Sequence, residues 1–267
     1  DKFKKNIDFI TYLNDAKVLE YNLNKTDKIY FEKIGNSNKT ILILPGWGNT
    51  RETFKYITSY FSKDYTIYII DYPGFGNSPT INKELTIYDY AQIINKLIKK
   101  EKIINPIIIA HSFGGRLSAI LLGKYNLKVD KIILIDVAGI KRRKTLKQFS
   151  KEKTYKLINK LTKNKFKEKL NKYFASTDYN NLQLSMRKTF INIVNEDLRK
   201  YYKKINTETL IIWGEKDNDT PLKDGKYLNK IIKNSSLIIY KNRTRFSYLE
   251  DPFLTNKIIY ELIKKED

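Results

Sequence analysis

Residues 106–117 read Pro-Ile-Ile-Ile-Ala-His-Ser-Phe-Gly-Gly-Arg-Leu, and this stretch decides the fold. A β-branched apolar run leads into a serine with small residues nearby, and an apolar helical segment follows. Strand, sharp turn, serine and helix form the layout of a nucleophile elbow, in which a strained turn lifts the hydroxyl clear of the sheet. Ala110 and Gly114 stand where strand and helix approach closely. We therefore predict that Ser112 is a nucleophile; the alternative is a strand-to-helix turn with an incidental serine.

Short apolar runs alternate with amphipathic segments on both sides of this elbow. Besides the elbow strand, strands are expected at 16–24, 28–34, 40–44, 66–70, 131–135, 209–213 and 237–240, and helices through 54–61, 85–98, 223–232 and 252–264. A polar turn at 25–27 joins the first two strands, and Asn49 or Thr50 is expected to cap the first helix. The alternation predicts an α/β fold with a mostly parallel central sheet flanked by helices. In such sheets the site lies at the carboxyl ends of the strands.

Residues 139–205 interrupt the alternation, because they contain no buried-type strand and have helical patterns. We expect a helical cap over 139–205, inserted into a core formed by 1–138 and 206–267. Within 141–172 the chain carries fourteen Lys or Arg and two Glu, a net +12 of the total +22. The simplest interpretation of this basic run is a solvated face; attraction of anionic substrates or of a membrane surface is the alternative.

The composition excludes several classes of function. The 267 residues contain no Cys and one His, which excludes disulfides, thiolate or His-rich metal sites and a cysteine nucleophile. No dinucleotide-binding fingerprint is present, so neither a cofactor nor a metal is expected. No apolar run approaches the roughly 20 residues that span a bilayer, and no signal-peptide pattern opens the chain, so a cytoplasmic protein without an integral membrane segment is expected. Basic and aromatic residues do not interleave as in nucleic-acid binders.

Acyl transfer through a serine needs two backbone N–H groups that hold the oxyanion. The loop at 45–48, Pro-Gly-Trp-Gly, is expected to supply the N–H of Trp47, with Gly46 beside it as a substrate-binding position. The N–H of Phe113, directly after the serine, is expected to be the second donor.

The same chemistry needs a base and an acid that orients it. Residues 211–221 read Ile-Ile-Trp-Gly-Glu-Lys-Asp-Asn-Asp-Thr-Pro, a strand followed by an acidic loop. This places Asp217 as the acid, with Asp219 and Asp136 as lesser candidates. The alternative for Asp217 is a solvated turn residue.

Together these motifs resemble the α/β-hydrolase superfamily, and within it the helical-capped bacterial hydrolases of unassigned substrate. The segments that carry the resemblance are 44–48, 71–78, 110–115, 213–217 with Pro221, and 176–179, 186–187 and 194–198 of the cap. The resemblance runs from about Tyr30 to the C-terminus. It implies a serine hydrolase that acts on a small acyl substrate such as an ester or thioester, and it does not specify the oligomeric state.

One position departs from this resemblance. The family has a histidine base after the eighth strand, typically in Gly-His-Phe-Ser-Tyr-Leu-Glu, whereas this chain has Arg245 in Thr-Arg-Phe-Ser-Tyr-Leu-Glu. A guanidinium cannot accept the serine proton near neutral pH. His111 precedes the serine and is expected to point away from it in a packing role. We predict an ion pair between Arg245 and Asp217; the alternative is that Arg245 extends into solvent.

The sequence therefore leaves a ranked set of functions. The first is a serine hydrolase scaffold with Ser112, Asp217 and the oxyanion hole, in which Arg245 impairs catalysis. The second is a pseudoenzyme that binds a small ligand or a protein, with Arg245 as a fixed charge for a carboxylate or phosphate. The third and weakest is a binder of membranes or nucleic acid through the basic cap, which steep salt dependence would reveal.

Overall fold

A computed structural model describes residues 17–22, 28–81, 83–141 and 184–264. In this part of the chain one eight-stranded sheet has the order β1-β2-β4-β3-β5-β6-β7-β8. The strands are β1 (Lys17–Asn22), β2 (Lys28–Ile34), β3 (Thr40–Leu44), β4 (Thr66–Asp71), β5 (Ile107–His111), β6 (Ile132–Ile135), β7 (Thr209–Gly214) and β8 (Ser235–Tyr240). From β4 to β8 the neighbours are parallel, and β2 pairs antiparallel with both β1 and β4. The predicted mostly parallel sheet is confirmed.

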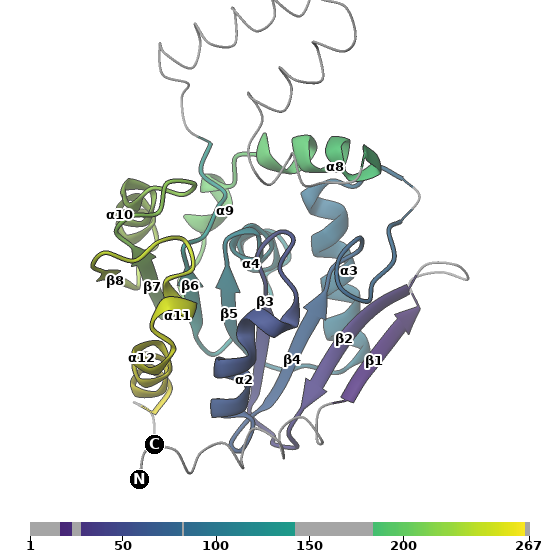
Figure 1. The fold of residues 1–267 in the computed structure, drawn as a ribbon, viewed down its shortest axis with the longest axis horizontal. Coiled ribbons are helices and arrows are strands. Elements are labelled where there is room, and N and C mark those ends of the chain that lie inside the picture. Colours follow the sequence, from purple (N-terminus) through teal and green to yellow (C-terminus); the bar gives the residue numbers. More distant parts are fainter. Residues whose placement is uncertain (1–16, 23–27, 82, 142–183, 265–267) are drawn as a thin grey trace, which may run out of the picture.

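Helices cover both faces of this sheet (Figure 1). They are the 3-10 turn η1 (Arg51–Phe54), α2 (Lys55–Phe61), α3 (Ile87–Lys100), α4 (Phe113–Gly123), α8 (Leu184–Val194), α9 (Arg199–Tyr202), α10 (Leu222–Ile231), α11 (Ser247–Glu250) and α12 (Pro252–Lys264). Figure 1 shows α8 lying across one end of the sheet, above α3 and α4.

Side chains of the central strands alternate between two buried clusters, because successive residues of a strand point to opposite faces. In β3, Leu42 and Leu44 pack with α3 and α4, whereas Ile41 and Ile43 pack with α2 and α12. Both faces are therefore sealed, which explains why these strands have continuous apolar sequences rather than alternating ones.

The strand predictions are confirmed to within a few residues, and two local expectations need correction. The first helix begins as a 3-10 turn, and Thr50 at its N-cap makes no side-chain capping bond. The short helix α11 was not predicted. The turn at 25–27 and most of the basic run at 141–172 lie outside the described residues, and the division into core and cap remains a prediction.

Candidate active site

The elbow holds Ser112 in a conformation that non-glycine residues rarely adopt. Its backbone has φ 46° and ψ −106° between β5 and α4. The peptide groups of Ser112 are tied on both sides: its N–H donates to Ile135 O, and its carbonyl accepts from the N–H groups of Gly115 and Ala138. Such strain costs on the order of 1–3 kcal/mol, so the surrounding bonds must fix it. The hydroxyl is thereby presented at the carboxyl end of the sheet.

The helix after the serine approaches the sheet so closely that only glycine fits. A Cβ at Gly114 would lie 1.9 Å from the carbonyl oxygen of Leu44, and a Cβ at Gly115 would lie 2.3 Å from Cβ of Val137. The small residues that the elbow pattern requires are therefore explained by contact with β3 and with the segment after β6.

Arg245 reaches the serine from the loop between β8 and α11. Its Nη2 donates to Ser112 Oγ at 2.6 Å, and its Nη1 donates to Asp219 Oδ2 at 2.8 Å. The predicted ion pair with Asp217 is wrong as stated, because the salt bridge of this guanidinium is with Asp219. The expectation that Arg245 extends into solvent is wrong too, since its side chain is only 16% exposed.

Asp217 does not pair with Arg245 because loop donors already hold its carboxylate. Oδ1 accepts from the N–H groups of Asp219 and Thr220 at 2.8 and 2.9 Å, and Oδ2 accepts from the Thr220 hydroxyl. The residue is 4% exposed, so the solvated-turn alternative is wrong. Burial raises the pKa of Asp217, while the bonds from Thr220 and Asp219 and the charge of Arg245 lower it in part.

His111 is fully buried behind the serine. Its Nε2 lies 3.0 Å from the carbonyl oxygen of Arg245, and its Nδ1 lies 3.3 Å from the Asn49 amide nitrogen. A carbonyl only accepts, so Nε2 carries the proton and Nδ1 accepts from Asn49. Burial, with the charge of Arg245, lowers the pKa of His111 to about 3, which keeps the ring neutral. The ring therefore positions the backbone of Arg245, in agreement with the expected packing role.

Asp136, the other candidate acid, joins three elements below the site. Its Oδ1 accepts from the N–H of Gly214 at 2.7 Å, and its Oδ2 bonds the Ser247 hydroxyl at 2.6 Å. These contacts connect the ends of β6 and β7 to α11. Burial raises the pKa of Asp136 to about 8, although its hydrogen bonds oppose the shift.

The two residues predicted to supply the oxyanion donors contact each other through their side chains. The rings of Trp47 and Phe113 contact edge to face, with centroids 5.1 Å apart. In the described part of the chain no hydrogen bond occupies either backbone N–H. A Cβ on Gly46 would lie 2.8 Å from His111 Nδ1 and 2.9 Å from the Asn49 amide, so the loop can carry only glycine there.

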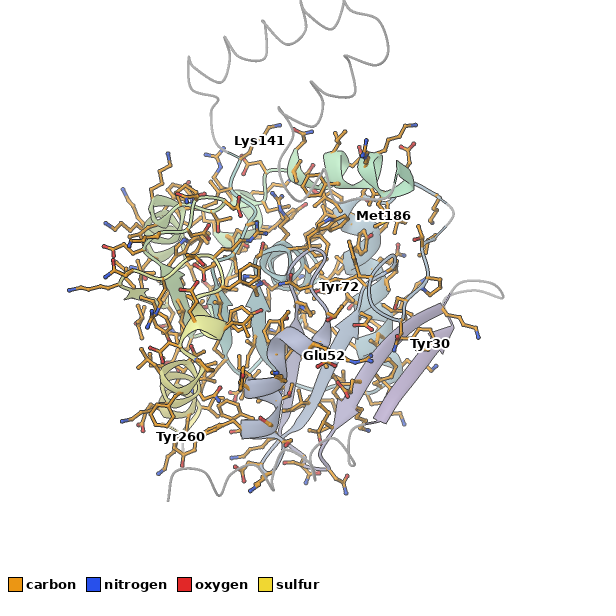
Figure 2. The ribbon with its side chains drawn as sticks, viewed as in Figure 1. Tyr30, Glu52, Tyr72, Lys141, Met186 and Tyr260 are labelled. Carbon is orange, nitrogen blue, oxygen red and sulfur yellow. The ribbon has the colours of Figure 1, made fainter. Side chains whose placement is uncertain are left out.

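A cavity of about 440 Å³ opens over the serine. Trp47, Ser112, Phe113 and Arg245 line it, whereas Gly46 and Asp217 do not. Its apolar wall comes from Ile140, Phe190, Ile193 and Val194, and its polar lining includes Arg116, Lys141, Asp219, Thr220 and Asp224. Figure 2 labels Lys141 and Met186 of α8 toward this end of the molecule, and Tyr260 at the opposite end.

Arg116 is a cavity residue that the sequence predictions missed. It lies on α4, and its Nη1 donates to the carbonyl oxygens of Ile193 and Glu196 at 2.9 and 3.1 Å. These carbonyls are at and just beyond the C-terminus of α8, where a cation is favoured. A sequence signal existed, because Arg116 is the only charged residue of α4; its partners, 77 and 80 residues away, gave none.

The fold and the sequence of this chain are similar to those of known proteins. A sequence model described as the alpha/beta hydrolase fold matches residues 39–181. The chain belongs to the alpha/beta hydrolase family. This hydrolase chain is 25% identical to the AB hydrolase superfamily protein YisY of Bacillus subtilis over 254 residues, covering 86% of the chain and 93% of that protein.

Two further similarities place this α/β-hydrolase among its relatives. It is 26% identical to a pimeloyl-acyl-carrier protein methyl ester esterase of Wigglesworthia glossinidia brevipalpis, covering 88% of the chain and 98% of the relative. The structure of an esterase from Exiguobacterium antarcticum superposes with a TM-score of 0.69 at 22% identity, covering 90% of the chain and 96% of the esterase.

Within the described residues of this α/β-hydrolase, no group of three or more acidic or histidine side chains is arranged to hold a metal ion. Over the same residues, none of the helices combines the length and the apolar character needed to cross a bilayer.

Proposed function

We propose that this chain is a serine-type carboxylic-ester hydrolase whose catalysis is impaired at Arg245. In this proposal Ser112 is the nucleophile, the N–H groups of Trp47 and Phe113 hold the oxyanion, and Asp217 is the acid that orients a base at position 245. One observation carries the proposal: the hydrogen bond of 2.6 Å from Arg245 Nη2 to Ser112 Oγ. Position 245 thus reaches the hydroxyl that a base would have to deprotonate.

An acyl ester is the substrate class that the relatives support, since one of them is named a methyl ester esterase. In the reaction, Ser112 Oγ bonds to the carbonyl carbon, and the oxyanion forms between the two N–H groups. The ester bond between the carbonyl carbon and the alcohol oxygen then breaks, and the departing alkoxide takes a proton from water. A second water hydrolyses the acyl-enzyme, which releases the acid and regenerates the serine. The cavity of about 440 Å³ has room for a small acyl group.

Arg245 impairs one step of this reaction, the removal of the proton from the Ser112 hydroxyl. Its guanidinium donates to Ser112 Oγ but has no lone pair to accept the hydroxyl proton. Solvent hydroxide must therefore take that proton, although the nearby positive charge favours the alkoxide once it has formed. When the nucleophile, the base or the acid of such a site is lost, the remaining groups still accelerate the reaction by roughly 10³–10⁴-fold over the reaction in water.

The test is hydrolysis of p-nitrophenyl acetate by the chain as it stands, by Arg245→His and by Arg245→Gln, each with and without Ser112→Ala. Arg245→His restores a base, and we expect kcat/KM to rise roughly 10²–10⁴-fold. Arg245→Gln also removes the guanidinium but supplies no base, so it is the matched control and should show no such gain. Ser112→Ala should abolish the gain.

The pH profile sharpens this test. For the chain as it stands, kcat/KM should rise about tenfold per pH unit through neutrality, because hydroxide is the base. For Arg245→His it should level off above roughly pH 6.5, the ordinary pKa of histidine. A plateau near neutral pH with Arg245 present, or a gain that survives Ser112→Ala, would contradict the proposal.

We propose one alternative, a catalytically inactive module that binds a small anion. The observation that favours it is the same guanidinium, which donates to Ser112 Oγ in a cavity that Trp47 and Phe113 also line. A carboxylate or phosphate accepts bonds from a guanidinium. Absence of turnover in every variant, together with acetate binding that disappears in Arg245→Gln, would favour this module over the hydrolase.

A further inference from the structure

Arg116 is almost buried, with 8% of its surface exposed, and lines the same cavity as Ser112. Among the described residues no carboxylate forms an ion pair with it. Only Nη1 is used, for the carbonyl oxygens of Ile193 and Glu196. The other two nitrogens, Nε and Nη2, have no acceptor in the described chain. Neither of them is fully enclosed by protein atoms. Nε and Nη2 therefore keep some exposed surface, and Arg116 lines the cavity.

The charge of Arg116 is only partly balanced by its surroundings. The C-terminus of α8 contributes about half a negative charge. Glu196 and Asp197 lie near enough to raise the pKa of Arg116, yet burial outweighs them and lowers it to about 10. A partly desolvated cation with unused donors is costly unless an anion completes its contacts. A carboxylate on a ligand would supply this anion and leave the two bonds from Arg116 to the carbonyl oxygens of Ile193 and Glu196 intact.

The position of Arg116 relative to the serine sets what kind of ligand fits. Arg116 follows Ser112 by four residues, about 6 Å along the axis of α4. Helical side chains tilt toward the N-terminus, so the guanidinium inclines toward the elbow. The space shared by the two residues is walled by Trp47, Phe113 and Phe190. An acyl chain would lie against this apolar wall with its carbonyl at Ser112.

We propose that Arg116 binds a carboxylate at the far end of the acyl chain, so that the cavity prefers esters of dicarboxylic acids to neutral esters of equal length. This inference rests on the proposed hydrolase function and names its substrate class. Two acids also line this cavity. Asp219 is paired with Arg245 at the mouth, where its side chain is 64% exposed, and Asp224 on α10 is 5% exposed.

The experiment compares mono-p-nitrophenyl adipate with p-nitrophenyl hexanoate, which differ in a terminal carboxylate against a methyl group. It is run in the full chain with Arg245→His, and again with Asp219→Asn added, because losing Arg245 deprives Asp219 of its salt bridge. We expect the adipate ester to be preferred in kcat/KM by roughly 10- to 100-fold, the effect of one charge-assisted contact.

Arg116→Gln then separates recognition from a tethering role. Glutamine retains a donor for the α8 carbonyls but carries no charge. Any structural loss should therefore lower kcat/KM for both esters alike. Loss of the charge should lower the ratio of kcat/KM for the adipate ester to kcat/KM for the hexanoate ester by about tenfold or more. Arg116→Lys keeps the charge and should retain much of the ratio, which keeps the test valid if Arg116→Gln folds poorly. Lys188→Gln, an equal charge change on the exposed side of α8, is the matched control.

The failures are distinguishable. A ratio near one, or a ratio that Arg116→Gln leaves unchanged, overturns the role of Arg116 while the hydrolase stands. Turnover of neither ester overturns the hydrolase itself. Binding of free adipate to the same variants, measured by calorimetry, tests the role of Arg116 without catalysis. Binding that requires Arg116 supports the inference, and binding that does not require it overturns the inference.

Discussion

At the scale of single residues, the two acids near Arg245 have different surroundings. Asp217 is buried and its oxygens are fixed by loop N–H groups and the Thr220 hydroxyl, whereas the side chain of Asp219 is 64% exposed. A fixed, desolvated carboxylate can hold an imidazole in one orientation and stabilise its charged form. An exposed carboxylate is screened by water and contributes little.

We therefore expect the two acids to respond unequally in the Arg245→His background. Asp217→Asn should lower kcat/KM for p-nitrophenyl acetate by on the order of 10³–10⁴-fold. Asp219→Asn, the matched substitution two residues away, should change it by no more than about threefold. Steady-state kinetics at pH 7.5 would check this. A larger loss at Asp219 would assign the acid to that residue instead.

The residue types of this site could be predicted from sequence, but the partner of Arg245 could not. The motif around Asp217 indicated a carboxylate after β7, and the position of Arg245 after β8 indicated a group near Ser112. Which carboxylate meets the guanidinium depends on how the loop at 217–220 folds. There the N–H groups of Asp219 and Thr220 satisfy Asp217 first, and no spacing rule reveals that.

At the scale of elements, sequence patterns were most reliable where burial alone sets the structure. The bounds of β3 and of α12 match the expected 40–44 and 252–264. β3 is a continuous apolar run and α12 has apolar residues at helical spacing, and both signals are visible in the local sequence. The 3-10 turn at Arg51–Phe54 and the short α11 were missed because they are fixed by tertiary contacts, such as the stacking of Phe54 on Tyr248 at 4.9 Å.

Asp136 makes a prediction at this scale, because it joins β6, β7 and α11. Its pKa is raised by burial to about 8 in the folded chain, against about 4 in an unfolded one. The folded state thus binds a proton that the unfolded state has lost, so this group stabilises the fold fully below about pH 4. That contribution is lost as the pH rises through about 8.

Asp136→Asn should remove this pH dependence. Asparagine keeps an oxygen for the N–H of Gly214 and a donor for Ser247, and so resembles the protonated acid at every pH. In urea unfolding, the free energy of unfolding of Asp136→Asn minus that of the unsubstituted chain should increase steadily between about pH 5 and pH 8. Asp64→Asn, at an exposed position, is the control and should show a flat difference. A difference between Asp136→Asn and the unsubstituted chain that stays flat from pH 5 to pH 8 would mean that Asp136 is ionised in the fold.

At the scale of the whole molecule, charge is the dominant feature. The chain carries 51 Lys and Arg against 29 Asp and Glu, a net charge of +22. Surface ion pairs such as Lys188–Glu84 contribute at most about 1 kcal/mol each. They are too weak to offset the mutual repulsion of so many like charges, which destabilises a compact state. The sequence alone shows this imbalance, whereas the arrangement of the charges requires the fold.

Added salt should therefore stabilise this protein rather than weaken it. Screening acts over about 10 Å at 0.1 M ionic strength, so it reduces long-range repulsion while leaving buried contacts intact. We expect the Tm at pH 7, followed by circular dichroism, to rise as NaCl increases from about 0.05 to 0.3 M. The matched control is the same series near pH 9.7, the isoelectric point, where the net charge and hence the gain should vanish. A Tm that falls with salt at pH 7 would show that local ion pairs, not net repulsion, govern the electrostatics of this fold.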